Sequence, residues 1–318
     1  MKKIILFAML SAMLTGGAVS CSERSAAGGD SKASSASSAS LPNTAPLTGR
    51  VTVLGKEYDI ASTTEVDILA EDVTDEQLKA LVPELAKLPK LTVLYLNGNR
   101  ISDISPLAEL KGLKTLYLDN NKISDIRPLA ALTELKALSL YGNEISDITP
   151  LGQLTKLILL DIDNNDIVDI SPLSGLSELA VLTLDNNRIS DISPLAKLEK
   201  LSEVSLYLNE IGDISPLEKL TALTRLALGD NQISDISPLA GLTGLTELRL
   251  DNNRVEDITP LAKLTGLKEL YIGRNMIEDI TPLEKLTGLT RVNLWWNYVS
   301  EEDIERLKKA LPNCDILS

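Results

Sequence analysis

Residues 113–129 contain the pattern from which the fold can be predicted. They read Leu113-Lys114-Thr115-Leu116-Tyr117-Leu118-Asp119-Asn120-Asn121 and, after one Lys, Ile123-Ser124-Asp125-Ile126-Arg127-Pro128-Leu129. The pattern LxxLxLxxNxIxDI(S/T)PLxxLxx returns every 22 residues, in ten copies that begin at Leu91 and end near Ala310. Its Asn recurs at Asn99, Asn121, Asn143, Asn165, Asn187, Asn209, Asn231, Asn253, Asn275 and Asn297. A repeat of this length is the signature of a solenoid.

The positions within the repeat predict how each coil folds. Leu at positions 1, 4, 6, 17 and 20 and Ile at 11 and 14 form one apolar set, which a single coil cannot bury, so the coils must stack. Strand alternation directs positions 4 and 6 inward and positions 3 and 5 outward. Asn at position 9 can donate and accept hydrogen bonds in a buried bend. Pro at position 16 favours a short helical turn on the outer side, and we expect the Asp ladder at position 13 to cap that turn.

The repeat resembles the leucine-rich repeats of bacterial internalins, over residues 91–310. This resemblance implies an α/β solenoid, a right-handed arc with a parallel β-sheet on its concave face and short 3₁₀ segments on its convex face. Internalins use such arcs to grip proteins on host cells. The resemblance therefore implies adhesion through the concave face.

Both ends of the solenoid are expected to carry caps that include a helix. In the N-terminal cap, residues 48–90, the runs 51–53 and 57–60 predict a hairpin, residues 66–68 mimic a repeat strand, and Thr74 opens a helix with a capping box. The C-terminal cap, residues 300–318, overlaps the last repeat and begins with a helix after Ser300. Cys314 lies 25 residues after Leu289, and the repeat period predicts that it occupies the second Leu position as a buried core thiol.

The first 47 residues predict an export signal and a tether. Lys2 and Lys3 precede an apolar run, which is the layout of a signal peptide over residues 1–20. Ala18-Val19-Ser20-Cys21 resembles the lipobox of bacterial lipoproteins, in which the Cys carries the lipid. The alternative is an ordinary signal peptide with a chance Cys. Residues 21–47 then read as a lipidated Cys followed by a flexible Ser- and Ala-rich linker.

The amino-acid composition disfavours several classes of function. The net charge of −14 disfavours nucleic acid and anionic lipid, so membrane association is expected through the lipid anchor only. The chain has no His, and no nucleotide, nucleophile or zinc motif is present, so we expect neither an enzyme, a cofactor nor a bound metal. A calcium site among the concave acids is conceivable, but a solvated acidic face is the favoured interpretation.

Candidate binding residues come from the outward strand positions 5 and 7 and the turn beside them, where the repeat does not dictate the residue. Aromatic side chains are common anchors of protein interfaces, although Tyr also simply favours strands and the Trp pair could pack against the cap. An acidic stretch lies between two aromatic ends. The candidates are Tyr95, Tyr117, Tyr141, Asp161, Asp163, Asp185, Tyr207, Arg249, Tyr271, Trp295, Trp296 and Tyr298.

The sequence thus predicts a lipid-anchored, extracytoplasmic protein of a bacterial cell envelope. We expect it to recognise a protein partner, from a host or a cell surface, through its concave face. A carbohydrate-binding lipoprotein and a purely structural envelope lipoprotein are the alternatives.

Overall fold

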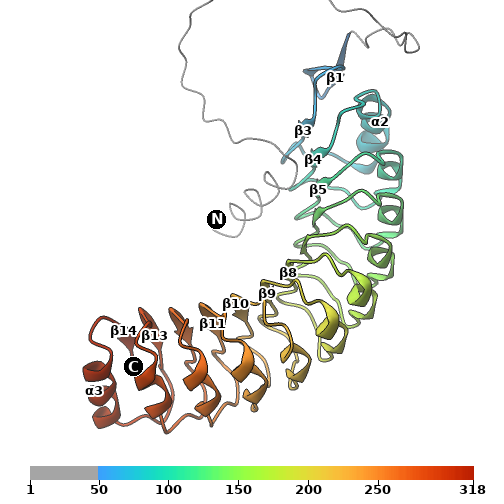
Figure 1. Ribbon diagram of the computed structural model, residues 1–318. Helices are drawn as coiled ribbons and strands as arrows, with labels where there is room; N and C mark the ends of the chain where they lie inside the picture. Colours follow the sequence, from blue (N-terminus) through green and yellow to red (C-terminus); the bar gives the residue numbers. More distant parts are fainter. Residues whose placement is uncertain (1–48) are drawn as a thin grey trace, which may run out of the picture.

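The computed structural model describes residues 49–318, which form an arc of stacked coils (Figure 1). Twelve strands make one parallel sheet along the inner side of the arc, in the order β14 to β3. Short 3₁₀ turns line the outer side. The predicted leucine-rich-repeat solenoid is confirmed. The predicted signal peptide, Cys21 and the linker lie outside the described residues.

Each repeat contributes one three-residue strand, and the strands pair in register so that equal repeat positions lie side by side. The repeat strands are β4 (Val93–Tyr95), β5 (Thr115–Tyr117), β6 (Ala137–Ser139), β7 (Leu159–Asp161), β8 (Val181–Thr183), β9 (Glu203–Ser205), β10 (Arg225–Ala227), β11 (Glu247–Arg249), β12 (Glu269–Tyr271) and β13 (Arg291–Asn293).

A 3₁₀ turn follows on the outer side of nine coils, each with Pro in its first turn. The Asp ladder supports these turns as predicted: the N–H of Ser193, for example, donates to Oδ1 of Asp191 at 2.8 Å. The turns are η1 (Ser105–Glu109), η2 (Arg127–Ala131), η3 (Thr149–Gln153), η4 (Ser171–Gly175), η5 (Ser193–Lys197), η6 (Ser215–Leu217), η7 (Ser237–Gly241), η8 (Thr259–Lys263) and η9 (Thr281–Lys285).

A continuous apolar core runs between sheet and turns, built from the repeated Leu and Ile side chains. The Asn ladder closes the bend after each strand. Nδ2 of Asn187 donates to the carbonyl oxygens of Leu184 and Ile162, both at 3.1 Å, while its Oδ1 accepts the N–H of Ile167 at 3.0 Å. Each Asn therefore joins its own coil to the preceding one.

The N-terminal cap forms as predicted. Strands β1 (Arg50–Val53) and β2 (Lys56–Asp59) make an antiparallel hairpin, and β3 (Glu65–Asp67) pairs with β4. Helix α2 (Asp75–Leu85) begins with the Thr74 capping box.

The C-terminal cap departs from the prediction at Cys314. Helix α3 (Glu301–Ala310) replaces the last 3₁₀ turn, and β14 (Asp315–Leu317) pairs with β13. The register places Ile316 beside Val292, an offset of 24 residues, because the α-helix lengthens this coil by two. Cys314 is therefore not at the second Leu position. It is only half-buried at the edge of the core, and burial raises the pKa of its thiol.

Candidate binding surface

The concave face is built from repeat positions 3 and 5, which point away from the core. Because the strands are parallel and in register, Tyr95, Tyr117, Ser139 and Asp161 follow one another across four strands. The predicted residues at position 5 therefore do form one row along the inside of the arc.

The row begins with two tyrosines that contact each other. The rings of Tyr95 and Tyr117 stack with their centroids 4.8 Å apart. Burial, followed by nearby carboxylates, raises the pKa of Tyr95. Tyr117 is only 6% exposed and belongs to a small cluster of buried side chains that is separate from the main core. Tyr117 is thus not the exposed anchor that the sequence predicted.

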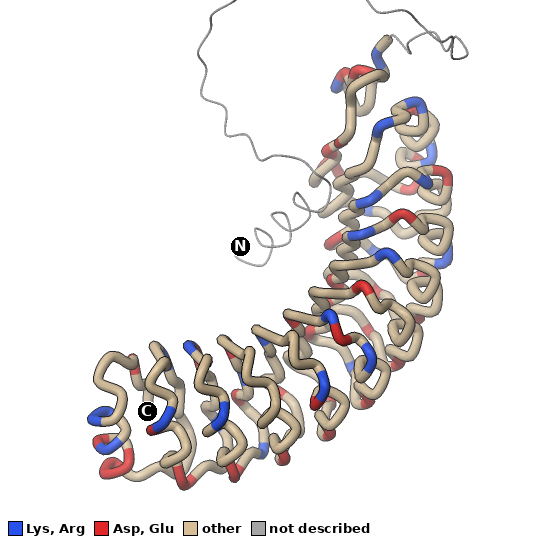
Figure 2. Tube along the Cα trace, in the orientation of Figure 1, with Lys and Arg blue, Asp and Glu red and all other residues tan. Residues whose placement is uncertain are grey.

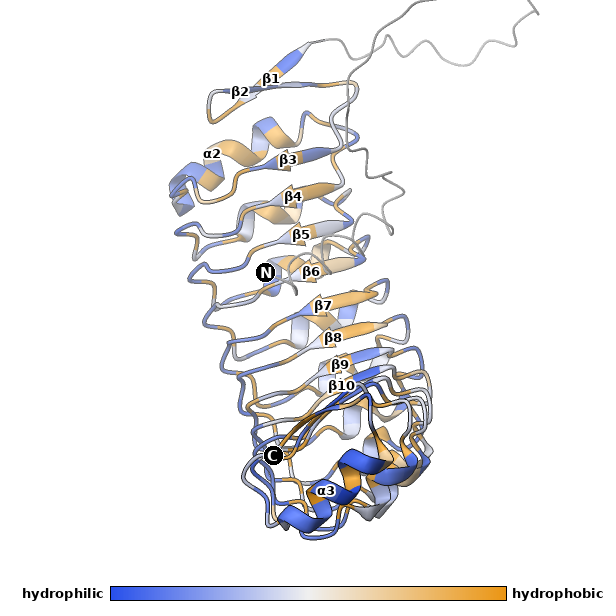
Figure 3. Ribbon diagram, turned by 90° about the vertical axis from the view of Figure 1, so that its left-hand side faces the viewer, coloured by the Kyte–Doolittle hydropathy of each residue, from blue (hydrophilic) through white to orange (hydrophobic). Residues whose placement is uncertain are grey.

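A second row, at position 3, was overlooked at the sequence level. The side chains of this row change from mostly hydrophobic to charged halfway along the arc. In Figure 3, strands β7 and β8 are orange, whereas β9 and β10 are blue. The alternation of the repeat could have revealed this row, since position 3 faces outward like position 5. The row reads Val93, Thr115, Ala137, Leu159 and Val181 in the first five repeats, then Glu203, Arg225, Glu247, Glu269 and Arg291. The first five side chains are buried and the last five are partly or fully exposed.

In the second half of the arc the concave side chains form a charged network. Arg225 pairs with Glu203 at 3.4 Å on one side and with Glu247 at 3.0 Å on the other. Glu247 also accepts from Nε of Arg249, whose guanidinium lies 4.4 Å from the centroid of the Tyr271 ring. The predicted residues Arg249 and Tyr271 are thereby brought together and held in place.

The acidic residues at position 7 support the backbone of the next coil. The carboxylate of Asp163 accepts the N–H of Asp185 at 2.7 Å, and that of Asp185 accepts the N–H of Tyr207 at 2.9 Å. Asp119 does the same for Tyr141 at 3.2 Å. These acids therefore shape the concave edge. Asp163 is buried, so it supports the backbone and is not the accessible binding residue that the sequence predicted.

Burial raises the pKa of Asp119 to about 6. Hydrogen bonds from Ser139 and Asn97 act in the opposite direction and lower this pKa. Asp161 accepts the N–H of Asp163 at 3.1 Å. Within residues 49–318 no group of three or more Asp, Glu or Cys side chains is arranged to hold a metal ion.

Four of the predicted aromatic side chains, at repeat positions 7 and 8, are at least one-third exposed. Tyr141 and Tyr207 are 38% and 39% exposed, and Trp295 and Trp296 are 49% and 77% exposed. An interaction with Asp230 raises the pKa of Tyr207 to about 12. These side chains do not form one contiguous cluster, because they come from repeats 3, 6 and 10.

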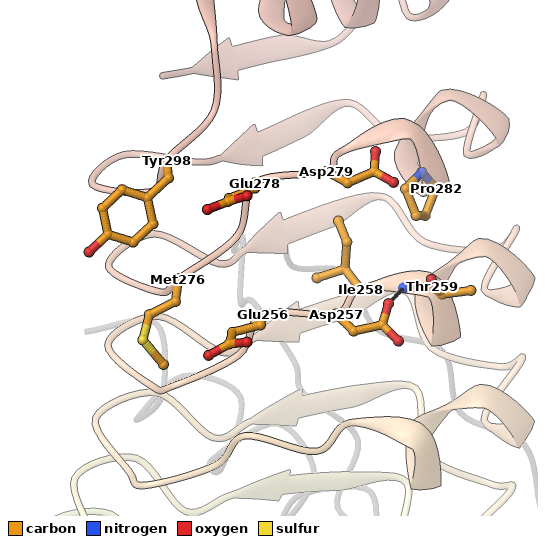
Figure 4. Close-up of a pocket in the computed structure, with 9 residues that line it drawn as sticks. All are labelled: Glu256, Asp257, Ile258, Thr259, Met276, Glu278, Asp279, Pro282 and Tyr298. Carbon is orange, nitrogen blue, oxygen red and sulfur yellow. Dashed lines mark hydrogen bonds between the residues drawn. The ribbon is translucent and has the colours of Figure 1, made fainter.

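Tyr298 lies elsewhere than predicted. It follows β13 and lines a depression on the side of the arc, where the chain leaves the strands and turns toward the 3₁₀ segments (Figure 4). Met276 and Glu278 from the preceding coil line the same depression. Tyr298 therefore belongs to this side, called the flank below, and not to the concave face.

Charged residues are dispersed along the arc. Figure 2 shows Lys and Arg interspersed with Asp and Glu on successive coils. No helix among residues 49–318 is long and apolar enough to cross a membrane.

Comparison with known protein families identifies the repeat. The family described as leucine rich repeats (2 copies) matches seven overlapping segments, which together span residues 89–263. No curated protein matches the chain.

Solved structures give more specific relatives. An internalin (inlF) from Listeria monocytogenes shares 38% identity over 80% of this chain and 79% of its own, with a TM-score of 0.74. Internalin C2 of the same organism shares 39% identity over 61% of this chain and 83% of its own, with a TM-score of 0.56. A leucine-rich-repeat protein of Leptospira interrogans shares 29% identity over 73% of this chain and 62% of its own, with a TM-score of 0.70.

Proposed function

The chain belongs to the leucine-rich-repeat family and is internalin-like, and from that premise we propose that it binds a protein partner through its concave face. Repeat solenoids of this kind are interaction scaffolds whose curvature creates extended binding surfaces. The proposed partner is a protein of a host or of another cell surface.

The observation that carries the proposal is the division of the concave face into two chemically different halves. Packing requires the same residues in every coil, so the core positions hardly vary. Position 3, which has no part in the main core, changes from buried, mostly apolar side chains in β4–β8 to charged and more exposed ones in β9–β13. The accessible side chains of this row are therefore the charged ones, which supports recognition of a partner that carries complementary charges opposite β9–β13.

The charged half is suited to binding because its side chains are already restrained. Arg249 is fixed by Glu247 and by the ring of Tyr271, whose hydroxyl donates to Glu269 at 2.8 Å. Side chains that are ordered before binding lose less conformational entropy on association. Tyr and Arg are also the residue types that most often anchor interfaces.

The distance between the two halves sets the size of the partner. Tyr141 lies in the third repeat and Tyr271 in the ninth, and six strand spacings correspond to about 29 Å. A folded domain or a long segment would span this distance.

We also propose that the protein is tethered to a bacterial cell envelope through a lipid on Cys21. The support lies in the sequence: a basic start, an apolar run and Ala18-Val19-Ser20 before the Cys. The Ser- and Ala-rich residues 22–47 would then act as a spacer between membrane and solenoid.

A comparative pull-down tests the concave-face proposal. The immobilised wild-type chain and the variants Tyr141→Ala and Tyr271→Ala are incubated separately with host and bacterial lysates. Each variant should bind a partner that the wild type retains at least about fivefold more weakly. The matched controls Lys197→Ala and Lys263→Ala lie on the outer turns η5 and η8 and should retain the partner fully. Loss of the partner in the outer variants alone would overturn the proposal.

A carbohydrate ligand is the second candidate. Its support is the exposure of the Trp295 and Trp296 rings, since exposed indoles stack on sugar faces. A glycan array separates the candidates: specific glycan binding with no protein captured would favour the second.

A further inference from the structure

The flank of the last two coils breaks the pattern that the other repeats keep. Position 10, directly after the Asn ladder, carries Arg, Lys, Glu, Asp or Gln in the first eight repeats. In the last two it carries Met276 and Tyr298, which are 36% and 70% exposed. Because the fold accepts a charged residue here in seven repeats and Gln in one, packing does not require the apolar residues.

Trp296, on the same turn as Tyr298, adds a second departure. Its backbone φ is 62°, in the left-handed region that position 8 adopts in every repeat. Seven other repeats place Asn, Asp or Gly there, and Leu208 and Arg274 are the two remaining exceptions. The left-handed region disfavours bulky side chains, and Trp296 gains no compensating burial, since its side chain is 77% exposed. Local strain without a packing benefit points to function.

Met276 and Tyr298 border a depression of about 520 Å³ that acidic side chains complete (Figure 4). Glu256 and Glu278 line it from neighbouring coils, and neither takes part in an ion pair within residues 49–318. Asp257 and Asp279 lie next to them and are engaged with the backbone of the 3₁₀ turns, through the N–H groups of Thr259 and Thr281. The site thus combines an adaptable thioether, an exposed aromatic ring and carboxylates whose charge is not neutralised.

This combination of side chains indicates the chemistry of the ligand that would fit the depression. We propose that the depression and the turn that carries Trp296 bind a polypeptide segment that presents an apolar side chain beside Lys or Arg. Met fits irregular apolar partners, Tyr attracts cations at its ring face, and the two Glu side chains complement a basic residue. A second copy of this chain fits poorly, because it carries a net charge of −14. The site is distinct from the concave face and does not depend on the concave proposal.

Selection from a phage-displayed library of random peptides on the purified chain tests the proposal. The matched variant Met276→Gln/Trp296→Asn/Tyr298→Gln restores residue types found at these positions in other repeats, Gln232 and Asn252 among them, so it should unfold at the same temperature or a higher one. Selected peptides should combine Lys or Arg with an aromatic or aliphatic residue. The triple variant should weaken their binding at least about tenfold, as loss of aromatic anchors does.

Two further comparisons complete the test. Glu256→Gln/Glu278→Gln should weaken the same peptides and reduce the salt dependence of binding, whereas Tyr141→Ala on the concave face should leave them unaffected. No enrichment, peptides without basic residues, or equal binding to the triple variant would overturn the proposal. Glycan binding that the triple variant loses, in place of peptide binding, would overturn it in favour of a carbohydrate site.

Discussion

Replacing Asn187 by Ala should destabilise the solenoid far more than any change at the neighbouring surface position. The side chain is 8% exposed and makes three buried hydrogen bonds to backbone groups: the carbonyls of Leu184 and Ile162 and the N–H of Ile167. A longer, part-buried one goes to the carbonyl of Asp185. Alanine can replace none of them. The perturbation therefore leaves the buried N–H of Ile167 without its partner. The carbonyls of Leu184 and Ile162 each lose one hydrogen bond and keep those from Asn209 and Asn165.

The magnitude follows from one orphaned N–H and two weakened carbonyls. An unsatisfied buried backbone group costs about 1–3 kcal/mol. That cost applies to the N–H of Ile167, while each of the two carbonyls loses one hydrogen bond, which is worth about 0.5–1.5 kcal/mol. We expect a loss of roughly 3 kcal/mol in the free energy of unfolding.

Urea denaturation followed by circular dichroism measures this loss, as a lower midpoint at an unchanged slope. The matched control is Asn186→Gly, one position earlier. Asn186 is exposed, has a φ of 52° that Gly accepts, and loses only a hydrogen bond to Asn164. Its effect should stay within about 0.5 kcal/mol, which is usual for surface changes. Equal losses from the two variants would refute the assignment of Asn187 to the buried ladder.

Three further predictions concern other parts of the chain. Cys21→Ser should abolish partition with membranes and leave thermal unfolding unchanged, and wild-type partition of the variant would exclude the lipid anchor. Burial raises the pKa of Asp119 in the folded state to about 6 from 3.8, so the folded chain binds the proton more tightly than the unfolded chain does. The contribution of Asp119 to the free energy of unfolding therefore falls as pH rises from about 4 to 6. Asp119→Asn should therefore gain stability relative to wild type between pH 3.5 and pH 7, on the order of 1 kcal/mol in urea titrations, and a pH-independent difference would contradict the shift. Leu208→Asn should raise stability by about 0.5–1 kcal/mol, because Leu208 is 44% exposed at a φ of 56°, and a lower melting temperature would show that its side chain packs.

The repeat made most of the fold predictable. The period placed the strands, the Asn ladder and the Pro-led outer turns, because each coil must repeat the same contacts to stack on the next. The period failed where a coil changed length. Helix α3 adds two residues to the last coil, so the position that repetition assigns to Cys314 is taken by Ile316.

The binding surface was less predictable, because side chains outside the core are not constrained by the repeat. Positions 5 and 7 were predicted to face outward, but Tyr117 at position 5 is buried against Tyr95 and its neighbours on adjacent strands. Asp163 at position 7 is buried as well. The change at position 3 was visible in the sequence and was overlooked. The left-handed conformation of Trp296 and the place of Tyr298 on the flank depend on backbone geometry that residue types alone do not give.

Carbene footprinting of the chain, alone and with its captured partner, tests the concave-face proposal most directly. The proposal predicts reduced labelling at Tyr141 and Tyr271, on the two halves of the concave face, and unchanged labelling at Lys197 and Lys263 on the outer turns. Protection confined to the outer turns, with both tyrosines labelled as in the free chain, would contradict it.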